Sequence, residues 1–170
     1  IFVMVGTAKN SSIPEKCRKA LEAQGLNVGL ATPELAVLGG EVLTVQDCGS
    51  AAAARTILCH PEADALLLIV WDDDLIHAGL PFDQCNGIFL CGRHINGTRS
   101  LSDAKPQQVM SRLLSYLLPA CRGTVHTVAG SGVDASGLRG TGEADWNEQP
   151  VERPDIPRLL AQAVGAVLKN

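Results

Sequence analysis

The sequence predicts an α/β domain in which a mostly parallel sheet carries helices on both faces. Runs of consecutive apolar residues, such as Ala65–Trp71 and Gly87–Cys91, are typical of strands buried on both faces. Stretches with helical spacing of apolar residues alternate with these runs, as crossover helices do in a parallel sheet. Hydrophobic residues make up 46% of the 170 residues but aromatic residues only 4%, so alanine, leucine and valine must fill the core. A chain of this length suits one domain.

The N-terminal segment predicts a strand, a helix and a second strand. Ile1–Val5 is a continuous apolar run and predicts the first strand. Pro14–Gln24 predicts a helix, because proline suits the first helical turn and Gly25 suits the C-terminal stop. Leu26–Ala31 then predicts a short second strand.

A hairpin and a further helix are predicted next. Leu35–Val45 contains two apolar runs around Gly39-Gly40, which is typical of a β-hairpin. Ser50–Cys59 predicts a helix with Ser50 as its N-cap and a proline just beyond its end.

The rest of the chain divides into three parts. Asp103–Leu118 predicts the longest helix and Thr124–Ala129 a further strand, and these complete an α/β domain over residues 1–130. Residues 131–154 are rich in glycine, acidic residues and proline, and predict a loop or linker. Residues 155–170 predict an amphipathic C-terminal helix.

Composition excludes several classes of function. The net charge is −4 and no long basic run is present, so we expect no nucleic-acid partner. No apolar run reaches the length of a membrane span, so we expect no membrane partner. No two cysteines form a C-x-x-C pair, which argues against zinc and favours reduced thiols in a cytoplasmic protein. The six cysteines are Cys17, Cys48, Cys59, Cys85, Cys91 and Cys121.

The first strand leads into a candidate phosphate-binding loop. The strand runs into a glycine and small polar residues, and a helix follows, which is the layout of such a loop. Backbone N–H groups and the helix N-terminus would point at an anion there. A working loop also has a Gly-Lys-Ser/Thr triplet, which this chain lacks. The candidate nucleotide-binding residues are Gly6, Thr7, Lys9, Asn10, Ser11 and Ser12.

Two interpretations of this loop remain open. In one, Lys9 takes the place of the missing lysine and Ser11 holds Mg²⁺. In the other, which we favour, the segment is a strand-to-helix turn with a solvated lysine. Weak anion binding at the helix N-terminus could then survive without catalysis.

An acidic triplet follows the buried strand Ala65–Trp71. Asp72, Asp73 and Asp74 lie at the edge where sites form in open α/β sheets. Together with His77 or His94, these carboxylates could bind a cation or form a substrate edge. The alternative, which we favour, is a solvated acidic turn.

Several short motifs occur in a fixed order in the first half of the chain. They are Gly40-Glu41, Asp47-Cys48, Ala53-Ala54-Arg55, Pro61 and Asp64-Ala65, and the segment Leu75–Cys85 follows them. Their order and spacing resemble those of the Mur-ligase-like central domain of the cyanophycin synthetases, including the second synthetase type, which has one working active site. The resemblance covers about Ile1–Cys91, and Leu75–Cys85 is similar to the family pattern I-L-x-x-G-L-G-F-D-x-C.

The resemblance implies a fold, an activity and partners. The fold would be a P-loop NTPase-like Mur ligase central domain. ATP would phosphorylate a carboxylate, and an amine would attack the acyl phosphate, with ATP and Mg²⁺ as cofactors if any activity survives. The family places an ATP-grasp domain upstream in the same polypeptide, and we expect a homo-oligomer.

The chain departs from the family at the positions that carry the chemistry. In the family loop G-T-N-G-K-T-T, the lysine falls on Asn10 and the preceding glycine on Lys9. The family glutamate at the end of the buried strand falls on Ile69, and the following arginine falls on Asp72. A neutral amide cannot neutralise phosphoryl charge as an ammonium does, and isoleucine offers no oxygen to a metal.

These departures predict a catalytically degenerate ligase domain with a structural or oligomerisation role. The parent protein would be an ATP-dependent acid–amino acid ligase whose activity lies in its other domain. Two alternatives remain. One is a still-active ATP-dependent amide ligase domain acting through an acyl phosphate. The other is a non-enzymatic interaction module that docks through the helix Asp155–Leu168.

Overall fold

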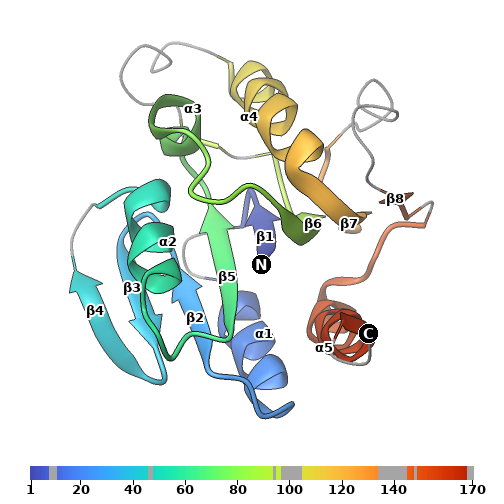
Figure 1. Ribbon diagram of the computed structural model, residues 1–170. Helices are drawn as coiled ribbons and strands as arrows, with labels where there is room; N and C mark the ends of the chain where they lie inside the picture. The colour runs from blue at the N-terminus through green and yellow to red at the C-terminus, as the bar shows by residue number, and fades with distance from the viewer. Residues whose placement is uncertain are drawn as a thin grey trace.

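A computed structural model shows one sheet with helices on both faces (Figure 1). In the part of the chain that it describes, eight strands lie in the order β4-β3-β2-β5-β1-β6-β7-β8. The described residues are 1–7, 11–45, 48–93, 95–96, 105–133, 145–147 and 149–167. The strands are β1 (Phe2–Val5), β2 (Val28–Ala31), β3 (Leu35–Leu38), β4 (Glu41–Val45), β5 (Ala65–Val70), β6 (Cys85–Leu90), β7 (Cys121–Thr127) and β8 (Asp145–Trp146). The helices are α1 (Ile13–Glu22), α2 (Ser50–Leu58), α3 (Asp74–Ala78), α4 (Pro106–Ala120), the 3₁₀ helix η2 (Arg153–Asp155) and α5 (Ile156–Val167).

The sheet is mostly parallel, as predicted. All neighbouring pairs from β2 to β8 in the spatial order run parallel. The pairs β2–β3 and β3–β4 are antiparallel, which confirms the hairpin. Gly39 and Gly40 form its turn with φ of 56° and 87°, a region that glycine enters without steric cost.

The side chains of the central strand β1 point alternately to the two faces of the sheet and so contribute to two core layers. Val3 and Val5 face the layer covered by α2, α3 and α4. Phe2 and Met4 face the layer covered by α1 and α5. All four side chains are at most 3% exposed, so β1 is buried on both faces, which explains its continuous apolar sequence.

The helix α5 belongs to this fold, because its apolar face is covered within the chain. Ile156, Leu160 and Val164 are buried in the layer that contains α1 (Figure 1). The helix therefore does not present these three residues to a partner.

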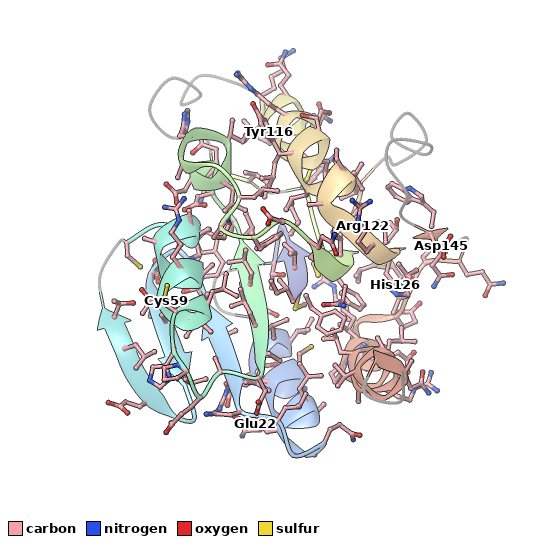
Figure 2. All side chains as sticks on the ribbon, in the orientation of Figure 1. Glu22, Cys59, Tyr116, Arg122, His126 and Asp145 are labelled. Atoms are coloured by element: carbon pink, nitrogen blue, oxygen red, sulfur yellow. The ribbon has the colours of Figure 1, made fainter. Side chains whose placement is uncertain are left out.

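Part of the segment predicted as a loop pairs with the sheet edge. β8 lies parallel to β7, and Asn147 Nδ2 lies 3.1 Å from Nδ1 of His126 on β7. His126 in turn stacks on Phe89 with ring centroids 4.8 Å apart. Figure 2 shows His126 and Asp145 near each other at this edge. A two-residue strand has no sequence periodicity, so pairing alone defines it.

The order of the strands creates a crevice beside β1. The connection after β1 forms α1 on one face, and the connection after β6 leads to α4 on the other face. Ligand sites in open α/β sheets form at the carboxyl ends of adjacent strands whose connections diverge in this way. Among the described helices, none is long and apolar enough to cross a membrane.

Candidate functional site

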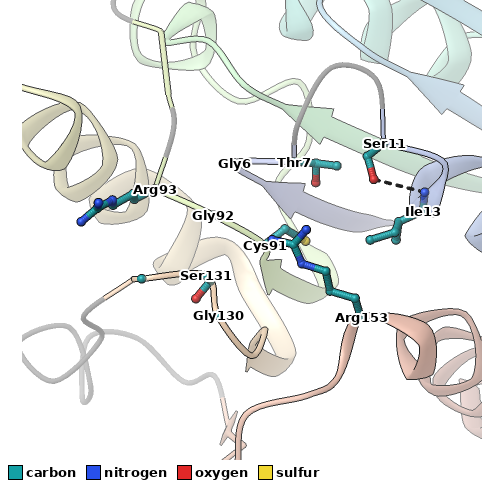
Figure 3. A pocket seen from close by; sticks show the side chains of 11 residues that line it. Gly6, Thr7, Ser11, Ile13, Cys91, Gly92, Arg93, Gly130, Ser131 and Arg153 are labelled. Carbon is teal, nitrogen blue, oxygen red and sulfur yellow. Dashed lines mark hydrogen bonds between the residues drawn. The ribbon is translucent and has the colours of Figure 1, made fainter.

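A cavity of about 410 Å³ lies at the carboxyl edge of β1, β6 and β7 (Figure 3). The start of α1 and the 3₁₀ helix η2 complete its walls. Its position matches the crevice that the strand order creates. The lining residues are Gly6, Thr7, Ser11, Ile13, Cys91, Gly92, Arg93, Gly130, Ser131, Gly132 and Arg153.

Two glycines allow the loops after β1 and β6 to approach each other. Gly6 has a φ of 72°, and its N–H donates to the carbonyl of Val70 at 2.8 Å. A Cβ atom placed on Gly6 would lie 1.7 Å from the carbonyl oxygen of Gly92. A side chain therefore cannot be accommodated at position 6, because both the backbone conformation and the contact exclude it.

Thr7 contributes a buried hydroxyl without a partner. The residue is 3% exposed, and its Oγ1 makes no hydrogen bond to any residue that the structure describes. The hydroxyl lies close to the thiol of Cys91, which is a weak hydrogen-bonding group. A buried hydroxyl usually has a partner, so an unsatisfied one beside a cavity indicates a group that the cavity receives.

The thiol of Cys91 is not an activated nucleophile. Burial raises its pKa to about 11, although Thr7 and Arg153 act in the opposite direction. The thiol is therefore protonated at neutral pH, and only the thiolate is a strong nucleophile.

Arg153 supplies positive charge to the cavity. It reaches from η2 toward Cys91, whereas Arg93 extends away from the cluster (Figure 3). Neither arginine has an ion-pair partner among the described residues. A guanidinium that stays charged and unpaired in a recess favours an anionic ligand.

The N-terminus of α1 adds a second source of positive potential. Ser11 Oγ accepts a hydrogen bond from the N–H of Ile13 at 3.2 Å, and both residues line the cavity. Ser12 occupies the N-cap position but is exposed, and its side chain caps no backbone group. The unsatisfied N–H groups of a first helical turn attract anions.

The structure thus brings together only part of the predicted loop site. Gly6, Thr7 and Ser11 line one cavity, and Ser12 does not. Lys9 and Asn10 lie outside the described residues.

The acidic triplet after β5 binds the ends of helices instead of lining this cavity. Asp72 Oδ1 accepts a hydrogen bond from the hydroxyl of Ser50 at 2.8 Å. Asp74 Oδ2 accepts one from the N–H of Ala51 at 2.9 Å, in the first turn of α2. Gly49, with a φ of 79°, precedes the helix, so the prediction of Ser50 as the N-cap is wrong. Asp74 from another segment bonds to the first turn of α2 instead.

Asp73 is the most buried member of the triplet. It is 0% exposed, and its Oδ2 lies 3.2 Å from Nε2 of His77, one turn further along α3. The segment is therefore not a solvated turn, because it enters a helix that the sequence did not predict. His94 lies outside the described residues, and among the described ones no cluster of three or more His, Cys, Asp or Glu could hold a metal ion.

Burial affects the titration of Asp72. It raises the pKa of this carboxyl group, while the hydrogen bonds from Ser50 and from the N–H of Asp74 act in the opposite direction. The charges of Asp73 and Asp74 raise the pKa further.

Sequence reasoning missed the cavity residues that come late in the chain. Gly130-Ser131-Gly132 follows β7 directly, and glycines after a parallel strand could have indicated a loop at the same edge. Arg153 carried no such signal, because it lies in the acidic and proline-rich segment predicted as a linker.

Comparison with known proteins gave no assignment, since no protein-family model matches the chain and no curated protein is similar to it.

Proposed function

We propose that this chain is a catalytically inactive Mur-ligase-like domain of a cyanophycin synthetase-like, ATP-dependent peptide ligase. In this proposal it has a structural or oligomerisation role, and ligation is carried out by an ATP-grasp domain of the same polypeptide. The observation that carries the proposal is the composition of the cavity after β1. Its described lining offers hydroxyls, backbone and arginine to a phosphate group, but no carboxylate.

The lack of a carboxylate in this lining bears on catalysis. Mg²⁺ prefers carboxylate and phosphate oxygens, and phosphoryl transfer to a substrate depends on such a metal ion. The lining therefore fits the phosphate of a nucleotide but does not fit its metal ion. The β5 position at which the family has a glutamate is Ile69, which is 0% exposed and pairs with Met4 of β1.

The active-ligase alternative needs a substitute carboxylate from the acidic triplet. Asp72 and Asp74 are bonded to the start of α2, and Asp73 lies against His77. Moving any of them to the cavity would break a partly buried hydrogen bond, which costs about 1–3 kcal/mol. The interaction-module alternative also loses support, because the apolar face of α5 packs within the chain.

The test is calorimetric titration of ATP into the protein, with and without Mg²⁺, on the natural sequence and on Lys9→Ala. An inactive domain predicts no ADP formation, and either no ATP binding or ATP binding that neither Mg²⁺ nor Lys9→Ala changes by more than about twofold. Lys9→Arg serves as a matched control that keeps the charge. Tightening of ATP binding by Mg²⁺, together with weakening by about tenfold or more in Lys9→Ala, would overturn the proposal.

A further inference from the structure

We propose that Arg153 completes a binding site for a phosphate group, together with Thr7, Ser131 and the N-terminus of α1. The ligand class is inorganic phosphate or the phosphate of a small monoester or nucleotide. The proposal rests on the proposed function only in taking the cavity as the remnant of a phosphate loop. Arg153 would supply, from the C-terminal part of the chain, the positive charge that the family loop obtains from its lysine.

Three elements face the cavity from different directions. Thr7 comes from the end of β1, Ser131 from the loop after β7, and Arg153 from η2 (Figure 3). Thr7 and Ser131 are 3% and 8% exposed. Ser131 Oγ accepts a hydrogen bond from the N–H of Val133 at 3.3 Å, which leaves its own proton available for donation. A tetrahedral group with several acceptor oxygens can use donors that converge from separate sides.

The charge of the cavity selects an anion. The α1 N-terminus and Arg153 both contribute positive potential, and no acidic side chain lines the described part of the cavity. A cation would be repelled, and a neutral ligand would leave the Arg153 guanidinium without a counter-charge from the described residues. The buried Thr7 hydroxyl, unpartnered among the described residues, is the independent sign of a missing ligand atom.

The backbone on both sides of Arg153 is held in place. Val151 lies beside β7, donating to the carbonyl of Thr127 and accepting from the N–H of Ala129, both at 2.8 Å. On the other side, Ile156 is 0% exposed and begins α5. Only a few residues separate these anchors, so the base of the Arg153 side chain is positioned before a ligand arrives. Preorganisation of this kind reduces the entropy lost on binding.

The site recognises the phosphate and not a nucleobase. None of the described lining residues is aromatic, so the cavity offers no stacking platform for a base. Its volume of about 410 Å³ is within the usual range for small ligands.

The experiment is calorimetric titration of inorganic phosphate into the whole chain at low ionic strength without Mg²⁺. We expect binding, and we expect Arg153→Gln to weaken it by about tenfold. Arg112→Gln is the matched control, since it removes the same charge from an exposed residue of α4 that does not line the cavity. We expect that control to change the affinity by less than about twofold. No phosphate binding, or equal effects of the two substitutions, would overturn the site.

The same series of titrations includes a control for misfolding and two further ligands that identify the source of the phosphate. Arg153→Lys keeps the charge but loses the fork of donors, so partial recovery of affinity supports a direct contact even if Arg153→Gln is unstable. ATP and adenosine form two further arms. ATP binding that Arg153→Gln weakens equally supports a nucleotide source, and phosphate binding without ATP binding supports a small phosphate. Adenosine binding without phosphate binding would contradict the proposal.

The two proposals can fail separately. Absence of phosphate binding with no Lys9-dependent Mg²⁺-ATP binding would remove the Arg153 site and leave the inactive domain standing. Lys9-dependent Mg²⁺-ATP binding with ADP formation would remove the inactive domain, and the phosphate titration would still decide the role of Arg153.

Discussion

Two loops at the same edge of the sheet use their polar residues in opposite ways. After β1, the Thr7 hydroxyl lacks a hydrogen-bond partner and Arg153, which lines the same cavity, lacks an ion pair, both within the described part of the chain. After the adjacent strand β5, Asp72, Asp73 and Asp74 each contact a polar group of α2 or α3. The described part of the first loop leaves the Thr7 hydroxyl available, and the second loop uses its carboxylates to join two helices.

The difference shows where a site is to be sought in this molecule. Three consecutive carboxylates are the more conspicuous feature of the sequence, but each of them contacts a polar group of α2 or α3, and none lines the cavity after β1. Thr7 and Arg153, which are distant in sequence, are less conspicuous, yet both line one cavity beside the N-terminus of α1. Unsatisfied polar groups next to a cavity indicate ligand binding more strongly than a local concentration of charge does.

The largest expected effect on stability comes from adding a side chain at Gly6, where the loops after β1 and β6 approach each other. Gly6→Ala should lower the free energy of unfolding by about 3–5 kcal/mol, because its Cβ would lie 1.7 Å from the Gly92 carbonyl oxygen. Gly25→Ala is the matched control, since Gly25 also has a positive φ, of 85°, but no atom within 4 Å of the added Cβ. That control should cost about 1 kcal/mol. Urea denaturation measures both, and similar losses for the two variants would refute the close approach of the loops.

An intermediate effect on stability is expected from removing hydroxyl groups, and it should differ between Ser50 and Thr7. Ser50→Ala removes the donor to Asp72 from a residue that is 0% exposed, and should destabilise the fold by about 1–3 kcal/mol. Thr7→Val replaces the unpartnered hydroxyl with a methyl group of the same shape. It should change stability by less than about 1 kcal/mol, in the stabilising direction. If Thr7→Val destabilised the fold as much as Ser50→Ala in urea, the Thr7 hydroxyl would have an internal partner.

The smallest expected effect is a change in pH dependence at Asp72. Burial raises the pKa of this carboxyl group above its ordinary 3.8, so its protonated form favours the folded state. The resulting stability is fully present below pH 3.8 and is lost as the pH rises through the raised value. Asp72→Asn should remove this loss, so that its free energy of unfolding declines less than that of the natural sequence over this window.

Urea unfolding at a series of pH values from about 3 to about 7 measures this slope. Asp83→Asn removes the same charge from an exposed position and serves as the control. A slope that Asp72→Asn leaves unchanged would show that burial does not govern the titration of Asp72.

The sequence predicted the helices and strands that are long enough to show a repeating pattern of apolar residues. Pro14–Gln24 corresponds to α1 within two residues, because helical spacing and terminal signals extend over several turns. The described part of the helix predicted over Asp103–Leu118 corresponds to α4, which continues to Ala120. The five-residue helix α3 and the two-residue strand β8 were missed, since neither is long enough to repeat a pattern.

The sequence by itself determined the class of fold and the location of the strand that organises it. A continuous apolar run followed by Gly6 and small polar residues places a buried strand before a loop and a helix, because these preferences are local. It also determined that Gly6, Thr7 and Ser11 would lie near one another at the end of that strand.

Only the tertiary structure decided which charged side chains lie beside Gly6, Thr7 and Ser11. The acidic triplet follows a strand adjacent to β1, but it does not line the cavity. Asp74 binds the N-terminus of α2 instead, because the N–H groups of a first helical turn need hydrogen-bond partners. Arg153 was remote in sequence but is carried to the cavity by the pairing of Val151 with the sheet and the burial of Ile156. Both outcomes depend on contacts between segments far apart in the chain, and no local pattern of residues encodes such contacts.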